Sequence, residues 1–406
     1  MILGIDIGGT KCAVIKARAD GENIELLDKR KIPTRLDITP EEMIKSLILL
    51  ADEMLDGETA EKVGISCGGP LNSVTGTIEC PPNLPGWDNV RITDILEKHY
   101  KAPAKLMNDA DACAAAEWKF GAGKGTQNMI FLTFGTGLGA GLILNGKLYS
   151  GTNGNAGEVG HIRLESFGPV GYGKAGSFEG FCSGGGLAQL GYIKALEKAQ
   201  TGVYPLYFKK GMTAADVTAK TVADAADKGD ETAKEVYRIC GEQLGKGLSV
   251  LIDILNPERI VIGSIFARSE DLLREGMERV INKEALPQSF KCCKIVPAAL
   301  GEKIGDYAAI AAVSGGGMSW RSSNLSDTPV MLYHGDNDNI VPIENSLMLY
   351  NSLKSKGCNA ELNVLYGYGH NDAIEKVYEE GNITNWLLSQ RREHFDYIPE
   401  FLEELF

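Results

Sequence analysis

Two glycine-rich turns are the segments of this sequence best suited to hold a phosphate. The first, residues 6–11, reads D-I-G-G-T-K between two apolar strands. Its glycines let backbone N–H groups approach an anion, while Thr10 and Lys11 add a hydroxyl and a cation. Asp6 could hold Mg²⁺ or a water beside that anion. Residues 129–144 repeat the strand–turn–strand pattern, so the two turns together predict a phosphate held between related halves of one α/β domain.

Asp109 is the carboxylate best suited to act as a catalytic base. It stands at the start of an alanine-rich stretch, residues 110–120, that predicts a helix. Backbone N–H groups and the helix dipole favour an ionised carboxylate there, which is also why aspartate is a common N-cap. Its position alone therefore favours a role as a helix cap. The two phosphate turns favour a role as a catalytic base, because a phosphoryl-transfer enzyme needs a carboxylate to accept the proton of the attacking hydroxyl.

Two further polar segments could bind a polyol. Glu158 and His161 lie among glycines in G-E-V-G-H, and both side chains can hydrogen-bond hydroxyl groups. Asn83 and Trp87 share the loop P-N-L-P-G-W, whose amide and aromatic ring suit a sugar. Each has a simpler explanation, because His161 can be a structural histidine and Trp87 a packed side chain beside a turn. The residues themselves leave both interpretations open.

The composition is that of a globular protein without nucleic-acid or membrane contacts. The chain has 406 residues, enough for two or three domains, and a formal net charge of −13, which would repel a polyanion. No apolar run approaches the roughly 20 residues of a membrane span, and no signal peptide precedes the first strand. The nine cysteines include no C-x-x-C pair, which favours reduced thiols in the cytoplasm.

The order of predicted elements divides the chain into two α/β lobes, a linker and a small module. Apolar or periodic segments predict strands over residues 62–67, 103–107 and 259–263, and helices over residues 40–56, 187–201, 213–228, 231–255 and 305–313. Small polar residues after Ser314 are typical of a linker, and a new strand begins at Val330. We therefore expect lobes over 1–120 and 121–317, a linker over 318–329 and a module over 330–406.

The motifs together resemble the ROK family of bacterial repressors, open reading frames and sugar kinases. In order they are D-I-G-G-T-K, G-G-P, P-N-L-P-G-W, N-D-A-D-A-C-A-A-A-E, F-G-T-G-L-G-A-G, G-E-V-G-H and I-V-I-G, and they span residues 1–317. The resemblance implies a duplicated actin-like (ribonuclease H-like) ATPase fold. It further implies phosphorylation of a hexose with ATP and Mg²⁺, with the 6-OH of glucose as the expected acceptor, by a cytoplasmic homodimer.

The resemblance also assigns roles to residues at the positions of these motifs. Asp109 would be the general base, and Asp6 would hold Mg²⁺ together with ATP. The sugar-binding residues would be Gly69, Asn83, Asn108, Asp109, Glu158, His161 and Glu179. The ATP-binding residues would be Asp6, Gly8, Gly9, Thr10, Lys11, Thr133, Gly135, Thr136 and Gly137, with Gly263 near the nucleoside.

One segment departs from the family pattern. Many members bind zinc through the histidine of G-E-x-G-H and cysteines in C-x-C-G-x-x-G-C-x-E, whereas residues 171–179 of this chain read G-Y-G-K-A-G-S-F-E. Glycine and serine cannot replace thiolate ligands, and Cys182 is alone nearby. We therefore expect no structural zinc, which leaves His161 with only its sugar contact. The altered loop between His161 and Glu179 is where the choice of sugar would be set.

The end of the chain resembles a different family. H-G-D-N-D-N-I-V-P and G-Y-G-H are similar to the end of an α/β-hydrolase of the esterase or peptidase type, in which Asp338 and His370 would be the acid and base of a triad. A formal G-x-S-x-G at residues 64–68 is followed by G-P rather than by a helix, so we expect no nucleophile and an inert module.

Two alternatives to a kinase follow from these resemblances. One is an esterase acting through the C-terminal module. The other is a sugar-sensing transcriptional regulator without its DNA-binding domain, because the first strand begins at Ile2 and leaves no room before it for a helix-turn-helix.

Overall fold

The computed structural model describes residues 1–20, 23–314, 330–338, 343–355, 359–369 and 376–377. Contacts between residues divide the chain into two compact units, Met1–Ser314 and Gly315–Phe406. Within these ranges, no helix is both long enough and apolar enough to cross a membrane.

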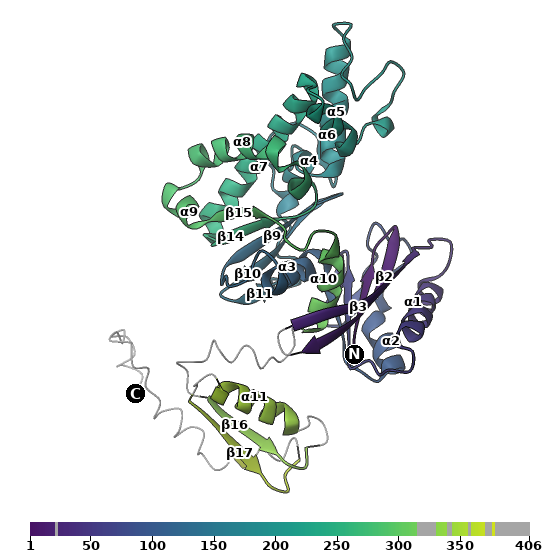
Figure 1. Cartoon of the computed structure of the whole chain (residues 1–406), viewed down its shortest axis with the longest axis vertical. Helices are drawn as coiled ribbons and strands as arrows, with labels where there is room; N and C mark the ends of the chain where they lie inside the picture. The colour runs from purple at the N-terminus through teal and green to yellow at the C-terminus, as the bar shows by residue number, and fades with distance from the viewer. Residues whose placement is uncertain (21–22, 315–329, 339–342, 356–358, 370–375, 378–406) are drawn as a thin grey trace. The chain divides into compact units, whose positions relative to one another are not determined.

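The first unit contains two five-stranded sheets with the same connectivity (Figure 1). In the order β3-β2-β1-β4-β8, the first sheet comprises Asn23–Pro33, Lys11–Asp20, Ile2–Ile7, Lys62–Cys67 and Ala104–Asn108. In the order β11-β10-β9-β14-β15, the second comprises Lys147–Tyr149, Leu138–Leu144, Met129–Phe134, Arg259–Ile262 and Lys294–Pro297. In both sheets the first three strands of this order are antiparallel and the last three are parallel. The duplicated α/β fold expected from the sequence is therefore present.

The two halves meet through a pair of equivalent helices. Helix α3 (Asp109–Phe120) follows β8, and helix α10 (Ile304–Ser314) follows β15. Ala112 and Ala116 of α3 cluster with Ala308 and Ala311 of α10, because small side chains allow two helices to approach closely. Helix α3 also packs on β10 at Gly141, where a Cβ atom would come within 2.5 Å of the Ala110 carbonyl oxygen. This packing places the start of α3 beside the β9–β10 hairpin.

Helices α1 (Pro40–Leu55) and α2 (Ile92–Tyr100) belong to the first half of the unit. Helix α1 begins with a capping box between Thr39 and Glu42, which agrees with the helix predicted from residue 40. The short elements of the unit are β5 (Leu71–Asn72), β6 (Thr77–Ile78), β7 (Val90–Arg91), η1 (Val159–His161), β12 (Val170–Gly171), β13 (Lys174–Ala175), η2 (Ala214–Asp216) and η3 (Gly301–Lys303).

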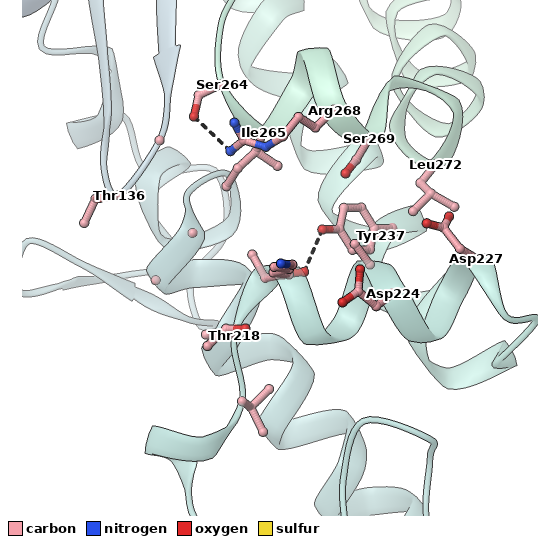
Figure 2. Close-up of a pocket in the computed structure, with 18 of the residues that line it drawn as sticks. Thr136, Thr218, Asp224, Asp227, Tyr237, Ser264, Ile265, Arg268, Ser269 and Leu272 are labelled. Carbon is pink, nitrogen blue, oxygen red and sulfur yellow. Dashed lines mark hydrogen bonds between the residues drawn. The ribbon is translucent and has the colours of Figure 1, made fainter. Parts of the chain in front are cut away.

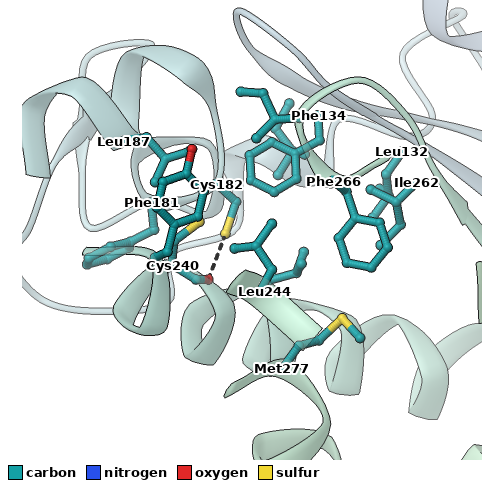
Figure 3. Close-up of a cluster of buried hydrophobic side chains, with 14 of the residues drawn as sticks. Leu132, Phe134, Phe181, Cys182, Leu187, Cys240, Leu244, Ile262, Phe266 and Met277 are labelled. Atoms are coloured by element: carbon teal, nitrogen blue, oxygen red, sulfur yellow. Dashed lines mark hydrogen bonds between the residues drawn. The ribbon is translucent and has the colours of Figure 1, made fainter. Parts of the chain in front are cut away.

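The second half carries a larger set of helices. They are α4 (Phe178–Phe181), α5 (Gly184–Ala199), α6 (Ala219–Asp227), α7 (Glu231–Leu255), α8 (Ile265–Glu284) and α9 (Pro287–Cys292). Figure 3 shows the core between α7, α8 and the second sheet, where Leu244 lies among Phe134, Phe266 and Met277. Helix α7 has the predicted bounds. Helix α8 was not predicted, although its buried residues Phe266, Leu273, Met277 and Ile281 recur at helical spacing.

The described residues of the second unit include a parallel pair of strands and a helix between them in the sequence. Strand β16 (Val330–Gly335) pairs with β17 (Ala360–Leu365), and α11 (Ile343–Ser355) connects them. Leu353 of the helix and Ala360 of the strand form its buried cluster. The predicted new strand at Val330 is therefore confirmed.

Candidate functional site

The first glycine turn is tight and touches the Asn83 loop. Between β1 and β2, the Gly8 N–H donates to the Lys11 carbonyl oxygen at 3.2 Å. A Cβ atom on Gly9 would lie 2.5 Å from the Asn83 carbonyl oxygen, so only glycine fits there. Thr10 and Lys11 are exposed. The turn thus leaves a hydroxyl and a cation free to meet an anion.

Asp6 stands behind this turn in a group of carboxylates. Burial raises the pKa of its carboxyl to about 6, with the charges of Asp109 and Asp306 adding to the rise and those of Lys29 and Lys11 opposing it. Asp306 comes from α10 and forms an ion pair with Lys29 of β3. Hard cations such as Mg²⁺ prefer carboxylate oxygens, and a cation would relieve this repulsion. Asp6 could thus supply a carboxylate ligand to Mg²⁺, with phosphate oxygens and waters as the other ligands.

Asn108 and Asp109 have different roles at the start of α3. The N-cap is Asn108, whose Oδ1 accepts from the Ala110 N–H at 2.9 Å. Asp109 is the first helical residue, and its Oδ1 accepts from the same N–H at 2.7 Å. Its Oδ2 lies toward Gly68, where a Cβ atom would be 3.9 Å away. The plain-cap role weighed for Asp109 thus falls to its neighbour, and one carboxylate oxygen of Asp109 has no part in capping.

The environment of Asp109 suits a proton acceptor. Burial raises the pKa of its carboxyl, the Ala110 N–H opposes the rise, and the Glu158 charge adds to it. The side chain is nonetheless accessible to solvent. A densely surrounded but reachable carboxylate can receive a proton from a molecule bound beside it.

The second glycine turn is braced on both sides. Thr133 Oγ1 accepts from the Gly139 N–H at 2.9 Å across the β9–β10 hairpin, so this hydroxyl maintains the hairpin. The Gly135 N–H donates to Gly137 at 3.1 Å, and the Gly135 carbonyl accepts from Gly184 at 2.7 Å. A Cβ atom on Gly139 would lie 3.8 Å from the Ala110 Cβ. The turn therefore lies between the starts of α5 and α3.

The predicted sugar residues occupy different surroundings. Glu179 Oε2 accepts from the Leu138 N–H at 3.0 Å and so supports the second turn. His161 is exposed, and its ring meets that of Tyr172 edge-on with 5.2 Å between centroids. Glu158 is close enough to Asp109 to raise the pKa of that carboxyl. The structure thus brings Glu158 toward the candidate base and places Glu179 against the turn.

Of the two candidate groups in the loop that contains Asn83 and Trp87, only the Asn83 amide is exposed to a ligand, because the Trp87 ring is buried. Asn83 is exposed, whereas Trp87 is only 2% exposed and belongs to the core of the first half. Trp87 therefore cannot stack on a sugar ring, and the simpler interpretation of a packed tryptophan is correct. Gly69 lies next to Asn108, where a Cβ atom would be 3.2 Å from the amide nitrogen.

A cavity of about 840 Å³ opens beside the second turn (Figure 2). Gly135 and Thr136 line its end nearest the turn. Gly263 is not among the lining residues, but Ser264 is, with a φ of 53° that is strained for a residue with a side chain. Most of the remaining wall comes from α6 and α8, with Tyr237 added by α7 and Gly184, Gly185 and Ala188 by α5. The lining residues of α6 and α8 include Ala219, Ala223, Asp224, Asp227, Arg268 and Leu272.

Hydrogen bonds fix the wall of this cavity. The Tyr237 hydroxyl donates to the Ala219 carbonyl at 3.0 Å, and Arg268 Nη2 donates to Ser264 Oγ at 3.2 Å (Figure 2). The contribution of α6 to this cavity was not predicted from the sequence. The spacing of small and acidic residues at 219, 223, 224 and 227, which share one helix face, could have indicated it.

The loop that replaces the family's zinc segment makes its own contacts. Lys174 Nζ donates to the His161 carbonyl oxygen at 2.7 Å. The Cys182 thiol is buried and lies 3.5 Å from the Cys240 carbonyl oxygen. Among the residues that the structure describes, no three His, Cys, Asp or Glu side chains form a group able to hold a metal. The absence of zinc stays a prediction.

We expect the purified protein to contain less than about 0.1 equivalent of zinc, since residues 171–179 lack the thiolates of a structural site. Elemental analysis after dialysis measures this directly. Prolonged EDTA treatment should leave the melting temperature unchanged, because no bound zinc contributes to folding. One equivalent of zinc, or a loss of stability in EDTA that zinc restores, would contradict the expectation.

The C-terminal unit places only part of the expected triad. Asp338 Oδ2 lies 3.5 Å from His334 Nε2, and the other ring nitrogen of His334 lies 2.7 Å from Ser346 Oγ on α11. His370 is outside the described residues. Ser66, the serine of the formal G-x-S-x-G, is 1% exposed within β4, and β5 rather than a helix follows. This serine is thus not on a nucleophile elbow.

The repeated sheets, each with a glycine turn beside its central strand, define an actin-like ATPase fold. Residues 2–314 match the ROK family, and the chain belongs to that family. Residues 312–394 match the prolyl oligopeptidase family, as the C-terminal motifs indicated.

Relatives include both kinases and regulators. A glucokinase of Halalkalibacterium halodurans is 33% identical over 310 residues, which are 75% of this chain and 92% of the relative. The Escherichia coli transcriptional regulator NagC is 30% identical over 257 residues, 63% of this chain and 61% of the regulator. A ROK glucokinase of Streptomyces griseus, solved in complex with glucose and AMPPNP, is 29% identical with a TM-score of 0.63, covering 78% of this chain and 99% of its own.

Proposed function

We propose that this protein is an ATP-dependent hexose kinase that phosphorylates the 6-OH of glucose or a related hexose. The observation that carries the proposal is the position of Asp109, which is accessible to solvent and begins the helix that packs against the second glycine hairpin. Asp109 takes the hydroxyl proton as the sugar oxygen forms its bond to the γ-phosphorus. The bond from that phosphorus to the β-phosphate oxygen breaks, and ADP leaves.

The phosphoryl donor would lie across the second turn and the adjoining cavity. Backbone N–H groups of the two turns would face its phosphates, with Lys11 and Thr10 contributing from the first. The cavity lined by Ala223, Tyr237 and Leu272 is large enough for a nucleoside. Asp6 would hold Mg²⁺, which when bound neutralises charge on the phosphates.

The sugar would lie on the other side of Asp109. Asn108 directly precedes the base, and the charge of Glu158 acts on it. Asn83 and His161 are exposed polar side chains able to bind hydroxyl groups. Gly69 leaves space beside the Asn108 amide. Glu179, which supports the second turn, would reach the sugar only through its second oxygen. The glucose complex of the S. griseus relative supports a hexose as substrate.

A coupled assay for ADP release tests the proposal. Glucose, fructose, mannose, allose and the N-acetylated hexosamines are offered in turn with ATP and Mg²⁺. We expect turnover with at least one sugar, and phosphorus NMR of the product should show a phosphate ester on the primary hydroxyl. Failure of every sugar would overturn the proposal.

Sugar-sensing regulation is the second candidate, favoured by the similarity to NagC. A regulator of this kind would bind a sugar without turnover, and if it acts on DNA despite lacking the expected helix-turn-helix, it would shift the mobility of DNA. A gel-shift experiment with upstream DNA, with and without sugar, separates the two candidates. Turnover with ATP together with no shift supports the kinase.

Filling the nucleoside cavity should weaken ATP binding selectively. We expect Ala223→Trp, on the α6 wall, to raise the KM for ATP about tenfold or more while the KM for the sugar changes little, because a large ring occupies space that the donor needs. Ala215→Trp, at an exposed position of η2 outside the cavity, is the matched control. Equal effects of the two substitutions would mean that the donor binds elsewhere.

A further inference from the structure

Asp111 is a buried carboxyl that the proposed reaction does not use. It lies two residues after Asp109 on α3, is only 5% exposed, and its Oδ2 accepts a hydrogen bond from Ser150 Oγ at 2.6 Å. A carboxyl in such a place costs free energy unless it has a partner. The Ser150 hydroxyl is such a partner, and the hydrogen bond between the two residues connects α3 to the segment that begins at Ser150.

Ser150 is the first fixed point of the loop over residues 150–158. Its carbonyl oxygen accepts from the Ala156 N–H at 3.1 Å. The second fixed point is Gly157, whose carbonyl accepts from the Ala140 N–H of β10 at 2.8 Å. Residues 151–155 between them are exposed. The loop is therefore attached to α3 through Ser150 and to the second sheet through Gly157.

Glu158 follows directly after the second fixed point, in a group of like charges. Burial raises the pKa of Asp111 to about 6, and the charges of Asp109 and Glu158 add to the rise, while the Ser150 hydroxyl opposes it. Glu158 likewise raises the pKa of Asp109. Repulsion between these carboxylates would tend to move Glu158 and its loop away from α3. The bond between Asp111 and Ser150 opposes that movement.

We propose that Asp111 is a positioning residue, which through Ser150 fixes the 150–158 loop and thereby the placement of Glu158 relative to the base Asp109. The inference rests on the proposed kinase function, since it concerns the sugar side of that site. Asp111 touches neither sugar nor ATP in this arrangement. Its loss should affect the sugar far more than the phosphoryl donor, because the lining residues of the donor cavity come mainly from the second turn and from helices α5 to α8.

Steady-state kinetics of substitutions at both ends of the bond test the inference. We expect Ser150→Ala to raise the KM for the hexose about tenfold, the size of effect typical for a hydrogen bond to a charged group, and to leave the KM for ATP within about twofold. Ser150→Thr keeps the hydroxyl and should restore wild-type values. Thr152→Ala, which removes a hydroxyl from the exposed part of the same loop, is the matched control.

A double-mutant cycle with Asp111→Ala adds a readout that a general loss of structure would not produce. If the two residues act through one bond, the double variant raises the hexose KM no more than the stronger single variant does. Multiplied effects, an equal rise in the KM for ATP, or a Ser150→Ala variant with unchanged sugar KM would each overturn the inference while leaving the kinase proposal intact. A wild-type protein that phosphorylates no hexose would overturn both.

Discussion

Asp109→Asn should lower kcat for hexose phosphorylation about 10³-fold, within the range measured for the loss of a general base. The change is nearly isosteric, and the amide oxygen can still accept the hydrogen bond from Ala110 that Oδ1 accepts now. The KM values should therefore change little, because binding is retained and only proton removal is lost. Stopped-flow or coupled assays at saturating ATP measure the effect.

The pH dependence supplies a second measurement on the same residue. A base acts when it is deprotonated, so kcat/KM for the sugar falls as the pH drops through the pKa of Asp109. Because burial and then the Glu158 charge raise this pKa, the acidic limb should lie above the range of an ordinary aspartate. Glu158→Gln removes one cause of the rise and should move the limb to lower pH.

The control for Asp109 is an aspartate outside the site. Asp94→Asn removes a carboxylate from the exposed face of α2, where it pairs with Arg91, and should leave kcat unchanged. Full activity of Asp109→Asn, or an equal loss in Asp94→Asn, would exclude Asp109 as the base.

Glu117→Ala should destabilise the protein by about 3–5 kcal/mol, the cost typical of disrupting a buried charged network. Glu117 is fully buried near the end of α3. One carboxylate oxygen accepts from the Ala122 N–H at 2.7 Å and from Ala299 at 3.2 Å, and the other accepts from Leu300 at 2.8 Å. Truncation leaves these backbone donors without their partner.

These donors lie on the two segments where the chain passes between the sheets. Ala122 is on the passage from α3 to β9, and Ala299 and Leu300 are on the passage from β15 to α10. Glu117 therefore joins both passages at one point, and its loss should weaken the attachment of the two halves to each other. Limited proteolysis of Glu117→Ala should accordingly cut near residues 121–128 or 298–303 faster than in the wild type.

Denaturant titration followed by circular dichroism measures the stability change. Glu117→Gln retains one acceptor oxygen and should fall between the wild type and Glu117→Ala. Glu275→Ala, on the exposed face of α8, is the control and should shift stability by less than about 0.5 kcal/mol. A loss below about 1 kcal/mol for Glu117→Ala would mean that water replaces the carboxylate at these donors.

The features that the sequence predicted are those encoded in contiguous segments. The two glycine turns depend on a few adjacent residues, and α7 carries its full apolar period within its own length. The start of α3 was placed within one residue, but the division of roles between Asn108 and Asp109 was not, since either residue can cap a helix. Deciding between them required the direction of each side chain, which depends on the packing around the helix.

The features that the sequence did not predict join segments distant along the chain. Asp306 meets Asp6 only because α10 returns to the first sheet, and Glu117 meets Ala299 only because two passages between the sheets run together. Trp87 was considered for a sugar contact because its aromatic ring shares a loop with the amide of Asn83, yet the ring is buried in the core. Such contacts form only in the assembled fold, and no local sequence motif predicts them.

Helices α3 and α10 follow corresponding strands of two sheets that share one connectivity, and they pack on each other through alanines. A protein consisting of one such half could make this contact only as a symmetric dimer, with each helix meeting its own copy. In such a dimer, every substitution at the interface would be present in both subunits. In a single chain the two helices have separate sequences, so each can differ from the other at this interface. One helix begins with Asp109 and the other with Ile304, so two halves of the same connectivity differ at equivalent helix ends, and only one of these ends carries the proposed base.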